Sequence, residues 1–96
     1  MKFKLVLSEL AQQQIKDAID YYQSLEHSTV KDDFLNDFYS SVEHLKTNPY
    51  YRFWTDKYRG MRLDKFPYIV FFRIQDNMIK IVSVFHTSQN PDKYPQ

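Results

Sequence analysis

The chain has 96 residues, 43% of them hydrophobic and 26% charged, and this composition predicts a single globular domain over residues 1–96 and excludes an intrinsically disordered chain. Thirteen basic and twelve acidic residues leave a net charge of +1, so we expect no direct DNA binding through a general positive field. The chain has no cysteine, no apolar run near the roughly 20 residues of a membrane span and no start with the layout of a secretory signal, so we expect a cytoplasmic protein without a membrane partner.

The first part of the chain predicts a short strand followed by a helix. Apolar residues occupy every second position over residues 2–7, which is the period of a strand. Ser8 is placed to cap a helix that runs to about Leu25, with Glu9 favourably placed in its first turn. The apolar residues of this helix recur at spacings of three and four, which predicts one buried face: Ala11, Ile15, Ala18, Ile19, Tyr22 and Leu25.

A short break at His27 and Ser28 precedes a second amphipathic helix, which begins at about Thr29. Its apolar stripe consists of Phe34, Leu35, Phe38, Val42 and Leu45. Pro49 ends this helix because proline cannot continue the backbone hydrogen bonds. The link between the helices is only a few residues long, so we expect an antiparallel helix hairpin that packs on one face of a sheet.

Residues 50–56 form an aromatic connector without clear periodicity, in which we expect Trp54 to anchor the loop. From Tyr58 the chain is extended again, and Gly60, the only glycine, marks a bulge or a close backbone contact. After His86 the chain turns polar and carries two prolines. The last ten residues are therefore expected to form a loop or a frayed tail.

Two apolar stretches, residues 68–74 and 78–85, predict an antiparallel β-hairpin around which the chain is organised. Asp76 and Asn77 suit a tight turn, which places Gln75 opposite Met78 and assigns every side chain to a face by alternation. One face is almost wholly apolar and is expected to be the core: Tyr68, Val70, Phe72, Ile74, Ile79, Ile81, Ser83 and Phe85. The other face carries Ile69, Phe71, Arg73, Lys80, Val82, Val84 and His86.

Four apolar side chains stand out on this second face, because an antiparallel sheet with one solvated face normally alternates to polar residues there. The helices can cover only one face, so Ile69, Phe71, Val82 and Val84 are predicted to form an exposed patch that binds a partner protein. The alternative is that the C-terminal tail covers this face through Tyr94, or that a second copy of the chain does so.

The predicted order is β-α-α-β-β-β, an α+β fold with the helix hairpin on one face of a four-stranded, mostly antiparallel sheet. An ordered set of residues spans nearly the whole chain. It consists of an Ala-rich first helix running into Ile19, Asp20, Tyr21 and Tyr22, a second helix ending in Leu45 and Asn48-Pro49, Arg62, Phe66-Pro67-Tyr68 with Ile69, Phe71 and Phe72, and His86 followed by Asn90-Pro91. This ordered set resembles the RelE/ParE toxin superfamily.

The resemblance implies a small bacterial toxin that is encoded beside a cognate antitoxin, whose tail wraps and neutralises it. ParE-like members are associated with inhibition of DNA gyrase, and RelE-like members with cleavage of mRNA on the ribosome. Many relatives carry an arginine three residues after the histidine, where this chain has the neutral Gln89, and this departure favours the ParE-like branch. A degenerate toxin that only binds its antitoxin is a third alternative.

The residues predicted to bind antitoxin or target are Ile69, Phe71, Lys80, Val82, Val84 and Gln89. For the alternative of an RNA endonuclease, Arg62, Arg73 and His86 form the predicted catalytic set, because RNA cleavage needs a base, an acid and cations beside the phosphate. No cofactor is predicted, since a single glycine cannot make a Gly-rich phosphate loop. No metal is predicted either, since the three histidines are far apart in the sequence.

Overall fold

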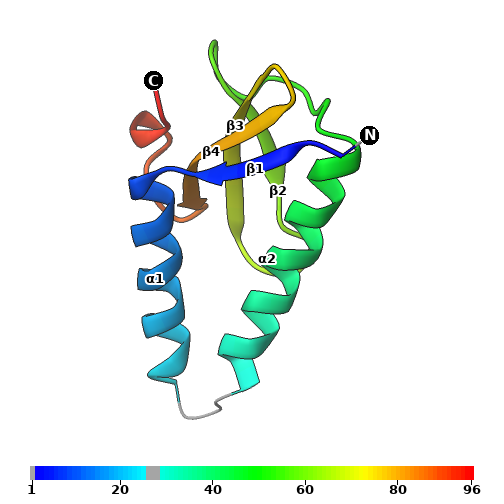
Figure 1. Ribbon diagram of the computed structural model, residues 1–96. Coiled ribbons are helices and arrows are strands. Elements are labelled where there is room, and N and C mark those ends of the chain that lie inside the picture. The colour runs from blue at the N-terminus through cyan, green and yellow to red at the C-terminus, as the bar shows by residue number, and fades with distance from the viewer. Residues whose placement is uncertain (1, 26–28) are drawn as a thin grey trace.

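The computed structural model describes residues 2–25 and 29–96 of the chain (Figure 1). Its elements in chain order are β1 (Lys4–Leu7), α1 (Glu9–Gln23), α2 (Thr29–Thr47), β2 (Arg59–Arg62), β3 (Tyr68–Gln75), β4 (Met78–His86) and the short 3₁₀ helix η1 (Pro91–Lys93). This order confirms the predicted α+β fold, and η1 adds local structure to the segment expected to be a loop. The predicted break at His27 and Ser28 lies outside the described residues.

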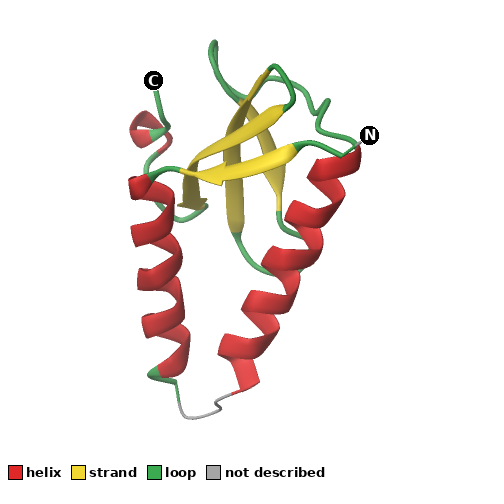
Figure 2. Cartoon of the chain, in the orientation of Figure 1, coloured by secondary structure: helices red, strands yellow, loops and turns green. Residues whose placement is uncertain are grey.

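The sheet has the strand order β1-β4-β3-β2, in which β1 is parallel to β4 and the other two pairs are antiparallel. This confirms a four-stranded, mostly antiparallel sheet. Figure 2 shows the sheet at one end of the helix hairpin, with the other ends of both helices extending away from it. Neither helix is long and apolar enough to cross a membrane, within the part of the chain that the structure describes.

The main core lies between the helix hairpin and one face of the sheet. Ser8 caps α1 as predicted, since its hydroxyl accepts a hydrogen bond from the Ala11 N–H at 3.0 Å. The predicted stripes of both helices face this core except at Leu25, which follows the end of α1 and is 39% exposed. The fully buried residues include Phe34 and Leu45 of α2. The sheet contributes Tyr68, Val70, Phe72, Ile79, Ile81 and Val84.

A buried carboxylate on α2 fixes the loop between β2 and β3. Asp37 is only 6% exposed, and its Oδ2 accepts hydrogen bonds from the backbone N–H groups of Lys65 at 2.9 Å and Phe66 at 3.0 Å. Each bond satisfies a loop N–H that makes no strand ladder contact. The side chain therefore ties the start of β3 to the helix hairpin.

The predicted hairpin register holds from the turn to the middle of the strands and then shifts. Gln75 pairs with Met78, and Asp76 has a positive φ of 56°, as a tight turn requires. Phe72 still pairs with Ile81, but Phe71 pairs with Ser83, so Val82 is an extra residue in a β-bulge. The bulge reverses the faces expected beyond it: Val84 packs in the main core and Phe85 on the opposite face.

The second face of the sheet carries a small core of its own, which corrects the predicted exposed patch. Ile69, Phe71 and Phe85 are 3%, 0% and 2% exposed, and Val82 is half-buried against them. Their cover consists of Trp54 and Tyr58 from the connector, which spans the residues between α2 and β2, and Tyr94 from the tail. Self-coverage through Tyr94, the alternative considered above, is what the structure shows, and the tail is not frayed there.

Trp54 anchors the connector, as predicted, and it explains the glycine in β2. A Cβ at residue 60 would lie 2.6 Å from Cε3 of the Trp54 ring, a distance that real Cβ atoms do not adopt. Gly60 thus permits a close contact between the strand backbone and the indole. The Trp54 ring in turn meets Phe71 edge to face, with the ring centroids 6.4 Å apart.

Candidate functional site

The bulge in β4 frees backbone groups from the strand ladder, and α1 supplies their partners. The Ser8 hydroxyl donates to the Val82 carbonyl at 2.9 Å. The side-chain oxygen of Gln14 accepts the Val84 N–H at 2.6 Å and the Ser83 hydroxyl at 3.1 Å. These bonds hold the first turns of α1 against the second half of β4, because leaving such groups unpaired in a part-buried position costs about 1–3 kcal/mol each.

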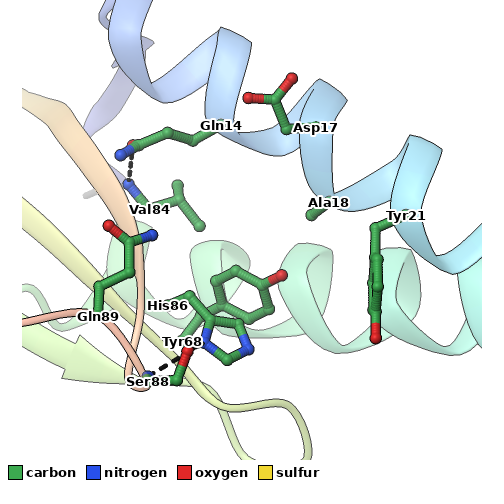
Figure 3. Close-up of a pocket in the computed structure, with 9 residues that line it drawn as sticks. All are labelled: Gln14, Asp17, Ala18, Tyr21, Tyr68, Val84, His86, Ser88 and Gln89. Carbon is green, nitrogen blue, oxygen red and sulfur yellow. Dashed lines mark hydrogen bonds between the residues drawn. The ribbon is translucent and has the colours of Figure 1, made fainter.

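This attachment leaves a hollow of about 380 Å³ between α1 and the end of the hairpin (Figure 3). Its floor comes from β3, β4 and the turn that follows, and its wall comes from α1. The residues that line it are Gln14, Asp17, Ala18, Tyr21, Tyr68, Val84, His86, Ser88 and Gln89. Three residues singled out from the sequence, Val84, His86 and Gln89, therefore meet here.

The orientation of His86 is fixed by its neighbours. The Ser88 N–H donates to Nδ1 at 3.1 Å, so Nδ1 is an acceptor and the neutral ring carries its proton on Nε2. The Ser88 hydroxyl also lies 2.7 Å from Nδ1. The ring meets Tyr68 edge to face at 4.9 Å between centroids, which seats the imidazole against the core. His86 therefore offers the hollow an N–H donor rather than a free base.

The hollow is nearly neutral. Burial, assisted by the neighbouring Tyr22, raises the pKa of the Tyr68 phenol above its usual value, so this group stays protonated at physiological pH. Asp17 is the one acid among the described lining residues, and it accepts a hydrogen bond from Gln13 at 2.8 Å. None of the lining residues that the structure describes is a lysine or an arginine. This set of donors, amides and rings suits a side chain of another protein better than a phosphate group.

A second hollow of about 400 Å³ lies between α2 and β2 and is lined by Ser40, Ser41, His44, Tyr51, Met61, Arg62 and Asp64. His44 and Tyr51 meet edge to face there, with centroids 6.3 Å apart. Across residues 2–25 and 29–96, no three His, Asp or Glu side chains gather closely enough to hold a metal ion.

Comparison with known proteins gives the family. Residues 5–91 match the family model described as the ParE toxin of the type II toxin-antitoxin system parDE. The chain belongs to this family. A solved structure described as the chromosomal ParDE TA system from P. aeruginosa has the same fold, with a TM-score of 0.77 and 18% sequence identity, and the match covers 88% of this chain and 96% of that chain. No curated protein matches the chain.

The three residues of the predicted catalytic set do not meet in this ParE-family toxin. Arg73 pairs with Lys80, whereas His86 pairs with Tyr68, five residues further back along β3 and therefore about 17 Å away. The bulge also turns His86 toward α1, away from the face that carries Arg73. Arg62 is exposed and contributes to the hollow beside α2. The expectation that these side chains share one face was wrong for His86, because two-residue alternation does not anticipate a bulge.

The residues predicted to bind antitoxin or target are divided by the structure. Ile69, Phe71 and Val84 are buried in the toxin itself, so they do not form the exposed contact surface that alternation suggested. Lys80 and Val82 are half-buried, and Gln89 is exposed at the first hollow. A role for these accessible residues in binding stays a prediction.

The sequence pattern missed the contribution of α1 to the first hollow. Gln14 lies one turn before Ala18 and one turn after Ala11, within the stripe that faces the core. A polar residue on a buried stripe indicates a specific hydrogen-bonding partner, and this signal was present. Nothing in the sequence indicates that the partner is the backbone of Val84, 70 residues away.

Proposed function

We propose that this ParE-family toxin arrests growth by binding and inhibiting DNA gyrase, and that a cognate antitoxin neutralises it. The observation that carries the proposal is the family match over residues 5–91. The site supports inhibition by binding, since the described residues that line the first hollow include no lysine or arginine to stabilise a phosphate in a transition state. The dispersal of Arg62, Arg73 and His86 gives no support to RNA cleavage on the ribosome.

We place the antitoxin at the outer edge of β1. This strand is the last of the sheet on its side. Its residue Val6 is 41% exposed, and Leu10 in the first turn of α1 is 55% exposed. An extended antitoxin segment can add a strand to such an edge and cover these side chains. Val6 pairs with Lys80 in β4, so a segment added here would lie one strand away from Lys80.

The purified chain tests the proposal directly. We expect it to inhibit supercoiling by gyrase and to leave mRNA intact in a translating extract. The product of the neighbouring reading frame is expected to reverse the inhibition when added in equal amount. Cleavage of mRNA without an effect on gyrase would show an endonuclease instead. Tight antitoxin binding without either activity would show a degenerate toxin.

A further inference from the structure

Two large aromatic side chains of the connector between α2 and β2 are exposed to solvent. Tyr50 is 67% exposed and Phe53 is 55% exposed. Their neighbour Trp54 turns inward, against Gly60 and the second core. Because successive residues of an extended segment point to opposite sides, the burial of Trp54 leaves Phe53 on the outside. The packing of the connector therefore presents Phe53 to a partner.

Arg59 is held against both exposed rings. Its guanidinium carbon lies 4.4 Å from the Phe53 ring centroid and 5.8 Å from that of Tyr50. Its Nη1 donates to the Tyr51 carbonyl at 2.6 Å, and an isolated β-bridge pairs Phe53 with Arg59. The two rings and the cation are therefore fixed before any partner arrives, and a partner that binds them loses little side-chain entropy.

The connector is also the positive part of the chain. Residues 50–58 of the connector, taken together with Arg59, the first residue of β2, contain three cations, Arg52, Lys57 and Arg59, and one acid, Asp56. Their net charge is +2 whereas the whole chain carries +1, so the remaining residues together carry −1. Within residues 2–25 and 29–96 the single ion pair joins Lys46 to Glu43, so no connector cation is paired with a carboxylate there. The surface is complementary to an acidic partner.

We propose that Tyr50, Arg52, Phe53, Lys57 and Arg59 form a connector surface through which this toxin binds its target, and that the target presents carboxylates beside apolar side chains. This inference rests on the proposed function, because it assigns the surface to the poisoned protein. Tyrosine and arginine are enriched among the residues that dominate binding energy at interfaces, and an arginine fork matches a carboxylate. A net charge of +1 and three local cations are a weak basis for nucleic-acid binding.

Variants of the connector surface test the proposal in cells and with purified protein. Phe53→Ser removes an exposed ring, and Arg52→Glu reverses an exposed charge. Tyr39→Ser and Lys16→Glu are the matched controls, since Tyr39 is 60% exposed on α2 and Lys16 is exposed on α1. Circular dichroism and thermal unfolding identify variants that are folded, and antitoxin affinity is measured separately for those variants. Growth arrest after induction and the toxin concentration for half-inhibition of supercoiling are then measured.

We expect Phe53→Ser and Arg52→Glu each to raise the half-inhibiting concentration roughly tenfold and to relieve growth arrest, with antitoxin affinity changed by less than about twofold. The control variants are expected to behave like the wild type. Loss of antitoxin affinity in step with toxicity would assign the surface to the antitoxin and overturn the proposal. Tight binding of oligouridine that these variants abolish would assign it to nucleic acid, with the same consequence.

The two levels of the proposal fail in different ways. If the wild type arrests growth without inhibiting gyrase, gyrase is not the target. In that case the connector surface is still the target-binding surface if its variants relieve the arrest. If the wild type inhibits gyrase and the folded connector variants inhibit it equally, the surface assignment fails and the function stands. A wild-type chain without toxicity overturns both.

Discussion

The tail that covers the second face of the sheet gives the sharpest test of the structure. The Tyr94 ring lies 5.0 Å from Phe71 and 4.9 Å from Phe85 between centroids, tilted against the first and edge to face with the second. Aromatic pairs at such distances contribute about 0.5–1.5 kcal/mol each beyond their buried area. Replacing Tyr94 by alanine is therefore expected to lower the free energy of unfolding by about 2 kcal/mol and the melting temperature by about 8–16 °C.

Urea unfolding measures the loss in the free energy of unfolding of Tyr94→Ala. Binding of an apolar fluorescent dye reports whether Phe71 and Phe85 become exposed. Tyr94→Phe is the matched control, because it keeps both ring contacts, and we expect its stability to lie within about 0.5 kcal/mol of the wild type. If Tyr94→Ala unfolded at the wild-type urea concentration and bound no more dye, the tail would not be what shields Phe71 and Phe85.

Three further changes test other contacts. Gly60→Ala places a methyl group against the Trp54 ring and should cost about 1–3 kcal/mol, with a shift in the emission of this single tryptophan. Asp37→Ala leaves two loop N–H groups without their acceptor and should cost about 2–4 kcal/mol in thermal unfolding, whereas the exposed Asp33→Ala should be nearly neutral. Burial raises the pKa of Tyr68 in the folded chain, so this phenol keeps its proton at a pH where the unfolded chain releases it. The contribution of the protonated phenol to the free energy of unfolding is therefore present below about pH 10 and is lost as the pH rises further. Tyr68→Phe should therefore lose less stability than the wild type between about pH 9 and 11, and equal alkaline slopes would contradict this.

Local patterns were sufficient for the elements and for half of the hairpin. Helical spacing identified both buried stripes, Ser8 and Pro49 marked helix ends, and the turn at Asp76 set the register as far as Phe72. Each of these features is set by residues that lie within a few positions of one another, so it can be predicted from local sequence patterns. The same order of elements was enough to indicate the toxin family, which the match over residues 5–91 confirms.

Only the tertiary structure decided which side chains lie on which face beyond the bulge. Two-residue alternation gives no sign of an extra residue, and Val82 is accommodated because Ser8 and Gln14 satisfy the backbone groups that the bulge frees. The tail likewise has no periodicity, yet Tyr94 finds an apolar face that the helices leave bare. Both outcomes depend on contacts between residues far apart in the chain. The sequence by itself therefore determined the strands, helices and family, while long-range packing determined the surface that remains for a partner.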